Sequence, residues 1–95
     1  MKNSQSIFVV SGVVQCVGFR YHTSRQAQKL AISGYAKNLN DGRVEVLAVG
    51  ESGQVDKLYQ WLQEGPASAI VDNVVKQRLG EDEKRNVRIG EFQIL

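Results

Sequence analysis

Two periodicities alternate along this chain, and each predicts its own kind of element. Residues 6–14 are rich in β-branched and aromatic types and predict a strand. Residues 35–39 and 43–49 predict two further strands on either side of Asn40-Asp41-Gly42. Asp-Gly readily adopts the turn that matches the twist of paired strands, so these two strands are expected to form a hairpin.

Helical spacing is clearest in the second half of the chain. Residues 54–64 predict a helix that ends at Gly65-Pro66. One face of this helix carries four apolar residues at positions i, i+3, i+4 and i+7: Val55, Leu58, Tyr59 and Leu62. Tyr59 and Trp61 are therefore interpreted as packing residues rather than as a binding platform.

An earlier helix is predicted from about residue 21 to residue 33. Its apolar positions recur at helical spacing: Ala27, Leu30 and Ala31. Gly34 stands where the C-cap of such a helix belongs, and Thr23 or Ser24 is expected to cap its start.

Strand-like alternation returns near the end of the chain, over residues 69–79 and 87–95, with a polar loop predicted over 80–86. The order is then β-α-β-β-α-β with an additional C-terminal strand. This order is typical of the split βαβ, ferredoxin-like plan, an α+β fold. Its two helices are expected to lie on one face of a mainly antiparallel sheet.

Composition narrows the class of protein further. With 95 residues, of which 42% are hydrophobic and one is proline, the chain is expected to form one globular domain over 1–95. Its basic residues are scattered and its net charge is only +2, so charge alone predicts no nucleic-acid or membrane partner. The strand predicted over 43–49 contains no aromatic residue, which is against base stacking of the kind that RNA-recognition sheets use.

Targeting and metal chemistry are not indicated either. No run approaches the ~18 apolar residues of a membrane span, and the first residues lack the apolar core of a signal peptide. Cys16 is the single cysteine, which excludes an internal disulfide, and Cys16 with His22 offers too few ligands for a metal site of the Cys/His type. These observations favour a cytoplasmic protein with no metal and no cofactor.

The stretch from Gly12 to Arg20, which reads GVVQCVGFR, carries the clearest chemistry. It predicts a strand running into a short loop, with Gly12 and Gly18 allowing the main chain to curl so that successive N–H groups point at one spot. Such a nest binds phosphate, especially where a helix begins. Arg20 adds a planar, permanently charged fork that matches phosphate oxygens.

This stretch and a second one, residues 34–50, together resemble the acylphosphatase family over nearly the whole chain. The first family motif, Gly-x-Val-Gln-Gly-Val-x-Phe-Arg, is matched at six positions: Gly12, Val14, Gln15, Val17, Phe19 and Arg20. The second motif is matched with every spacing kept, at Gly34, Tyr35, Ala36, Lys37, Asn38, Gly42, Val44 and Gly50.

The resemblance implies hydrolysis of acyl phosphates without a cofactor, with inorganic phosphate as product and inhibitor. A monomer is expected because nothing in the sequence demands a larger assembly. Six residues would bind the phosphoryl group: Gln15, Cys16, Val17, Gly18, Phe19 and Arg20. Arg20 would also stabilise the transition state, and Asn38 would orient the attacking water. An amide is not a base at neutral pH, so Asn38 would contribute positioning.

Cys16 departs from the family motif, which usually has glycine at this position. If the position requires a positive φ, cysteine is strained there. A thiolate nucleophile beneath an arginine is the sharper alternative, but phosphatases of that kind have five residues between cysteine and arginine. Only three separate Cys16 from Arg20. His22 is expected in the first turn of the helix, facing solvent or substrate.

A non-catalytic or regulatory phosphate-binding module with the same motifs is the alternative function. Taken alone, Arg20 is also compatible with a surface ion pair, and Asn38 with a turn former. The two in matched motifs favour the enzyme.

Overall fold

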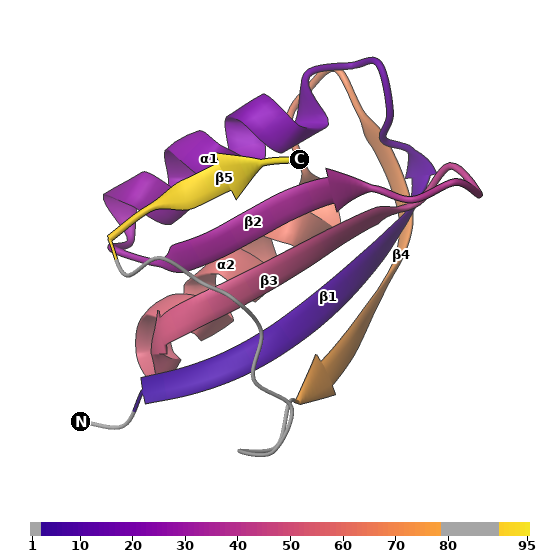
Figure 1. Ribbon diagram of the computed structural model, residues 1–95. Helices are drawn as coiled ribbons and strands as arrows, with labels where there is room; N and C mark the ends of the chain where they lie inside the picture. Colours follow the sequence, from indigo (N-terminus) through magenta and orange to yellow (C-terminus); the bar gives the residue numbers. More distant parts are fainter. Residues whose placement is uncertain (1–2, 79–89) are drawn as a thin grey trace.

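A five-stranded sheet with two helices forms the part of the chain that the structure, a computed structural model, describes: residues 3–78 and 90–95. The elements in chain order are β1 (Asn3–Val13), α1 (Phe19–Lys29), β2 (Ser33–Asn38), β3 (Val44–Glu51), α2 (Ser52–Glu64), β4 (Ile70–Arg78) and β5 (Phe92–Ile94). Figure 1 shows both helices on the far side of the sheet. The predicted α+β, ferredoxin-like fold is confirmed.

The strands lie side by side in the order β4-β1-β3-β2-β5. All neighbours are antiparallel except β2 and β5, which are parallel. β3 is therefore central, with β1 and β2 on either side of it, and the loop that leaves β1 lies next to the hairpin between β2 and β3 (Figure 1). Of the C-terminal strand predicted over 87–95, the structure describes Phe92–Ile94, and the loop predicted over 80–86 lies outside the described residues.

The main core lies between the sheet and the helices, because alternate side chains of each strand point to the same face. β1 contributes Phe8 and Val10, and α2 contributes the predicted face of Val55, Leu58 and Leu62. Aromatic rings join the layers: Tyr59 stacks on Phe8 at 5.2 Å between centroids, and Trp61 packs on Phe19 at 6.2 Å. The packing role predicted for Tyr59 and Trp61 is confirmed.

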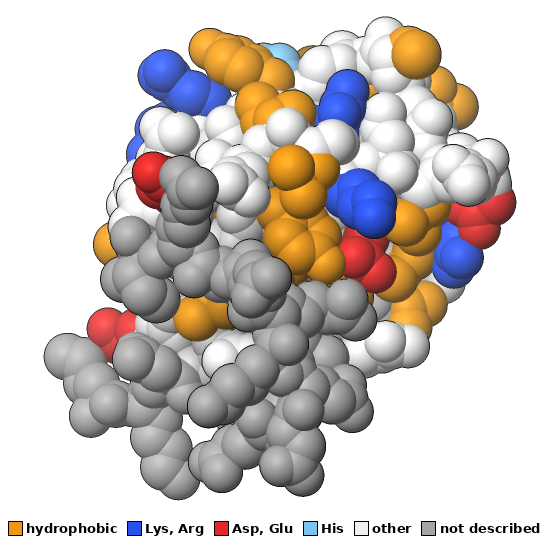
Figure 2. All heavy atoms as spheres, viewed as in Figure 1, with side chains coloured by type: hydrophobic (Ala, Val, Ile, Leu, Met, Phe, Trp, Pro, Cys, Tyr) orange, Lys and Arg blue, Asp and Glu red, His pale blue; other side chains and the backbone are white. Residues whose placement is uncertain are grey.

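The opposite face of the sheet carries a smaller apolar cluster. Ile7, Tyr35 and Leu47 are buried there, and Val9 and Val49 pack against them. Figure 2 looks at this face and shows apolar side chains among basic and acidic ones. The helix-covered face of the sheet is therefore the face on which α1 meets the strand ends.

The limits predicted for α1 were wrong at both ends. The helix begins at Phe19 with Gly18 as its N-cap, and the Thr23 hydroxyl donates to the Phe19 carbonyl within the helix at 2.8 Å instead of capping it. Ser24 is likewise inside the helix. The start therefore coincides with the end of the 12–20 motif, two residues earlier than periodicity predicted.

At its C-terminal end, α1 stops at Lys29 and not near Ser33. Ala31 adopts a left-handed φ of 55°, and the N–H of Ile32 donates to the Ala27 carbonyl at 2.9 Å, which is the Schellman arrangement. Gly34, the predicted cap, lies in β2 instead. A Cβ on Gly34 would lie 1.9 Å from the Leu47 carbonyl oxygen, so this glycine permits close approach of β3.

The predicted hairpin between β2 and β3 is present. The Leu39 N–H donates to the Arg43 carbonyl at 2.8 Å, and the Gly42 N–H donates to the Leu39 carbonyl at 3.3 Å. Gly42 has a φ of 94°, whereas Asn40 and Asp41 have negative φ. This is a three-residue connection with a left-handed glycine at its end, a common hairpin form that differs from the two-residue Asp-Gly turn.

Candidate active site

β1 bends just before the loop that carries the motif. The pairing of β1 with β4 shifts register between Ser11 and Gly12, where Gly12 has a φ of 128°. A Cβ on Gly12 would lie 2.1 Å from the Ile70 carbonyl oxygen. Gly12 thus lies at a β-bulge inside the predicted strand 6–14; the extra residue is Asp72 of β4, and β1 ends one residue after Gly12, at Val13.

The loop between β1 and α1 has alternating backbone handedness. Cys16 has a φ of 63° and Gly18 a φ of 76°, with Val17 between them at negative φ. This alternation turns successive N–H groups toward one side and forms an anion-binding nest. Within the described residues, the N–H groups of 15–19 donate no hydrogen bond. They lie at the N-terminus of α1, where the helix dipole also favours an anion.

Cys16 therefore occupies the strained conformation that the motif's usual glycine adopts freely. Its side chain is exposed. For an L-residue the left-handed region is unfavourable by about 1–2 kcal/mol. Position 16 thus requires a positive φ, the case in which a cysteine is strained.

Arg20 lies in the first turn of α1 and is half-buried. Its Nη1 donates to the main-chain oxygen of Leu95 at 2.7 Å. A guanidinium has five N–H donors, so this bond leaves the others for an anion while it limits the swing of the side chain. The contact joins residues 75 positions apart.

Asn38 is the last residue of β2 and pairs with Val44. Because Ala36 of the same strand belongs to the core beneath the helices, Asn38 projects to the helix-covered side as well. Its Oδ1 is buried and, within the described residues, has no hydrogen-bond partner. Buried carbonyl oxygens are normally satisfied, so this acceptor calls for a donor such as water.

Leu95 connects the two predicted catalytic residues. Its main-chain oxygen accepts the Arg20 guanidinium and, at 3.4 Å, the main-chain N–H of Asn38. Its own N–H donates to the Ala36 carbonyl at 2.8 Å, which extends the pairing of β5 with β2. The structure thus brings together the start of α1 and the end of β2, as the motifs predicted.

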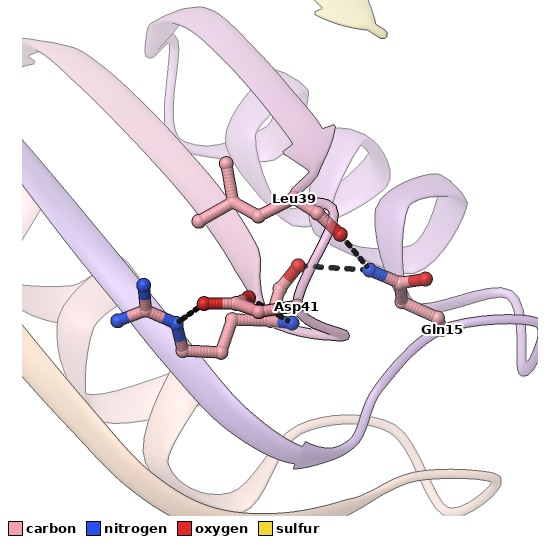
Figure 3. Close-up of polar contacts among 4 residues, drawn as sticks. Gln15, Leu39 and Asp41 are labelled. Atoms are coloured by element: carbon pink, nitrogen blue, oxygen red, sulfur yellow. Dashed lines mark hydrogen bonds and ion pairs between the residues drawn. The ribbon is translucent and has the colours of Figure 1, made fainter.

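The Gln15 side chain makes a contact that the sequence did not indicate. Its Nε2 donates to the Leu39 carbonyl at 2.8 Å and to the Arg43 carbonyl at 3.0 Å (Figure 3). In the same hairpin, Asp41 accepts the Arg43 N–H and pairs with its guanidinium at 2.7 Å. The Arg43 N–H, followed by the guanidinium, lowers the pKa of the Asp41 carboxyl, although burial opposes this shift.

A second anchor of the loop was also missed. The Ser68 hydroxyl donates to the Val17 carbonyl at 2.6 Å across 51 positions of sequence. No motif singles out Ser68, so only the folded chain reveals it. The loop is thus held by two contacts: Gln15 binds the hairpin between β2 and β3, and Ser68, in the segment between α2 and β4, binds Val17.

His22 is exposed in the first turn of α1, as expected, and its ring lies beside Gly18: a Cβ there would be 3.6 Å from Cδ2. Next to it, a hollow of about 450 Å³ is lined by His22, Arg25 and Trp61 among others. Neither Asn38 nor any residue of 15–20 lines this hollow. The lining of this hollow therefore does not include the 15–20 loop.

Two further findings concern the described residues as a whole. Neither helix is long and apolar enough to cross a membrane. In the same ranges, 3–78 and 90–95, no three His, Cys, Asp or Glu side chains gather as a metal site would require.

Comparison with known proteins agrees with this geometry. The acylphosphatase family model matches residues 6–94. An acylphosphatase of Vibrio parahaemolyticus is 50% identical over 86% of this chain and 91% of its own, and one of Vibrio cholerae is 58% identical over 78% and 81%. The crystal structure of acylphosphatase from Bacillus subtilis superposes with a TM-score of 0.86 at 30% identity, over 99% of both chains. The chain therefore belongs to the acylphosphatase family.

Proposed function

We propose that this protein hydrolyses acyl phosphates to a carboxylate and inorganic phosphate by in-line attack of water. The 15–20 loop and Arg20 hold the phosphoryl group, and Asn38 orients the water. One observation carries this assignment of roles. Among residues 3–78 and 90–95, a loop whose N–H groups make no hydrogen bond, a guanidinium and a buried carbonyl oxygen without a partner occur together at one end of the fold.

The substrate class follows from the kinds of group that the site holds. An acyl phosphate has a carboxylate as its leaving group, so little proton transfer to the departing oxygen is needed. Phosphoryl transfer of this kind depends on charge neutralisation and alignment of the nucleophile. Main-chain donors and an arginine supply the charge, and a carboxamide supplies the alignment.

Arg20 is proposed to bind the equatorial oxygens and to stabilise their charge in the transition state. Its bond to Leu95 holds the guanidinium close to β2 before substrate arrives. A preorganised donor of this kind contributes more than a mobile one, because no reorganisation accompanies the reaction.

Asn38 is proposed to accept a hydrogen bond from the attacking water through Oδ1. This oxygen has no partner in the part of the chain that the structure describes, which supports the role, since a water there would satisfy it. The main-chain N–H of Asn38 is bound to Leu95, so the strand end that carries the amide is held in place.

Cys16 is not assigned the role of nucleophile. Three residues separate it from Arg20, and the thiol is exposed on a loop whose N–H groups are the anion-binding feature. The backbone of this short loop does not wrap a phosphate around the sulfur as the longer loops of cysteine phosphatases do.

We further propose that the enzyme acts as a cytoplasmic monomer, without a nucleic-acid or membrane partner. Its loop, Arg20 and Asn38 come from one chain, and the low net charge of +2 supports the absence of a polyanionic partner. Inorganic phosphate is expected to inhibit competitively because it fits the same loop.

Arg20→Ala tests the proposal, with Arg25→Ala as a matched control on the same helix. Benzoyl phosphate is supplied with a chelator present, and its hydrolysis is followed with and without phosphate. Arg20→Ala is expected to reduce turnover at least ~10²–10³-fold while circular dichroism stays native. Arg25→Ala should leave turnover unchanged. Turnover retained by Arg20→Ala would rule out the mechanism, and phosphate binding by the unmodified protein without turnover would favour the non-catalytic module.

A further inference from the structure

The Gln15 carboxamide links the phosphate-binding loop to the hairpin that carries Asn38. Its two bonds reach the carbonyls of Leu39 and Arg43, the pair that closes the hairpin immediately after the last β2–β3 rung. Leu39 is the residue next to Asn38. The link shown in Figure 3 therefore ends at Leu39, one residue along the chain from the amide that is proposed to orient water.

Donor counting shows that this side chain is not itself a ligand for phosphate. A carboxamide NH₂ has two N–H groups, and both are used on the two carbonyls. The remaining atom, Oε1, is an acceptor, which an anionic phosphoryl group repels. In the described structure, the Gln15 side chain thus has no donor left for substrate.

The loop has a second anchor that does not touch the hairpin. Ser68 donates to the Val17 carbonyl from the segment between α2 and β4. Loss of the Gln15 anchor would therefore leave the loop attached at Val17 and at the start of α1. It would lose its direct link to the strand end next to Asn38, while the Leu95 oxygen would still bridge Arg20 and the Asn38 N–H.

We propose that the Gln15 side chain is a positioning residue that sets the distance and angle between the phosphate-binding loop and Asn38. The inference rests on the proposed role of Asn38 and goes beyond it by assigning the element that aligns water with the bound phosphoryl group. A misplacement of about 1 Å in a catalytic group reduces rate by as much as ~10²-fold. A defect of this origin appears in kcat, because phosphate is bound by other groups.

The test uses Gln15→Met, which keeps the length of the side chain and removes both donors. Ser68→Ala is the matched control, because it removes the other anchor of the same loop. Each is measured for kcat, KM and inhibition by inorganic phosphate. Gln15→Met is expected to lower kcat at least about tenfold with KM and phosphate inhibition unchanged. Ser68→Ala is expected to weaken phosphate binding instead.

A double-mutant cycle with Asn38→Ala separates positioning from simple loosening of the loop. If Gln15 acts through Asn38, the double variant is no slower than Asn38→Ala alone. The inference would be overturned if Gln15→Met and Asn38→Ala lowered kcat by factors that multiply in the double variant. It would also be overturned if Gln15→Met changed kcat, KM and phosphate inhibition in the same way as Ser68→Ala. The proposed function would stand in either case. Full activity in Asn38→Ala would overturn the proposed role of Asn38 instead, so the two failures are distinguishable. Thermal melting confirms that each variant is folded.

Discussion

Replacing Asn38 with alanine separates a functional amide from a structural one. Asparagine beside a hairpin is often a turn former, and removal of such a residue destabilises the fold. Here the main-chain bond to Leu95 and the pairing with Val44 do not involve the side chain, so alanine keeps both. The side-chain oxygen, being buried and unpaired among the described residues, contributes no bond that alanine would remove.

The expected change in stability follows from that accounting. An unsatisfied buried acceptor is unfavourable by about 1–3 kcal/mol, and a bound water reduces this penalty. Asn38→Ala should therefore leave the free energy of unfolding unchanged or raise it by up to about 2 kcal/mol. For a domain of this size, each kcal/mol raises Tm by roughly 4–8 °C.

Activity, unlike stability, is expected to fall in Asn38→Ala. Loss of the group that aligns water should lower kcat about 10²–10³-fold, with a much smaller change in inhibition by phosphate. Benzoyl phosphate hydrolysis measures the first quantity, competition by inorganic phosphate the second, and thermal melting the stability. Asn40→Ala, two residues further along the chain, is the control and should keep full turnover.

Two outcomes would refute this reasoning. A drop in stability of about 1 kcal/mol or more, the usual result of a substitution, would show that the amide has a structural partner. A loss of phosphate affinity larger than the loss of kcat would show that Asn38 binds the phosphoryl group rather than the water.

Three further predictions concern the backbone. Cys16→Gly should raise the free energy of unfolding by about 0.5–1 kcal/mol in urea titrations, because relief of the left-handed strain exceeds the added entropy of the unfolded chain. Complete loss of activity in this variant would instead favour Cys16 as a thiolate nucleophile. Ala31→Gly relieves the same strain at the end of α1 and should stabilise similarly with turnover unchanged, whereas a fall in Tm would contradict the cap geometry. Gly34→Ala should destabilise by about 4 kcal/mol, since its Cβ meets the Leu47 carbonyl, while Gly42→Ala, with nothing within 4 Å, should lose only about 1–3 kcal/mol. Equal losses for these two would show that β2 and β3 yield more easily than their contact indicates.

The elements that local pattern predicts best are those whose period agrees with their packing. In α2 the spacing of Val55, Leu58 and Leu62 matches the buried face, and in β1 the alternation about Phe8 and Val10 matches the core. The sequence pattern predicted the wrong end for α1, because backbone geometry decides where that helix stops. Ala31 ends α1 in a conformation usually taken by glycine, so the next glycine, Gly34, was mistaken for the cap.

The candidate site was predictable as a set of residues but not as an arrangement. The motifs place Arg20 and Asn38 in one site, and the fold brings the start of α1 to the end of β2. The links between them are long-range: Leu95 to Arg20, Gln15 to the hairpin, and Ser68 to Val17. None has a local sequence signal, because each depends on strand order and register.

By itself, the sequence determined the class of fold, the family resemblance and the residue types that are proposed to meet a phosphoryl group, because periodicity and motif spacing are local properties. Only the tertiary structure decided which groups are still unsatisfied after folding. The loop N–H groups and the Asn38 oxygen are unpaired among the described residues, whereas both Gln15 donors are used. That distinction depends on hydrogen bonds between residues far apart in the chain, which form only when the sheet is assembled.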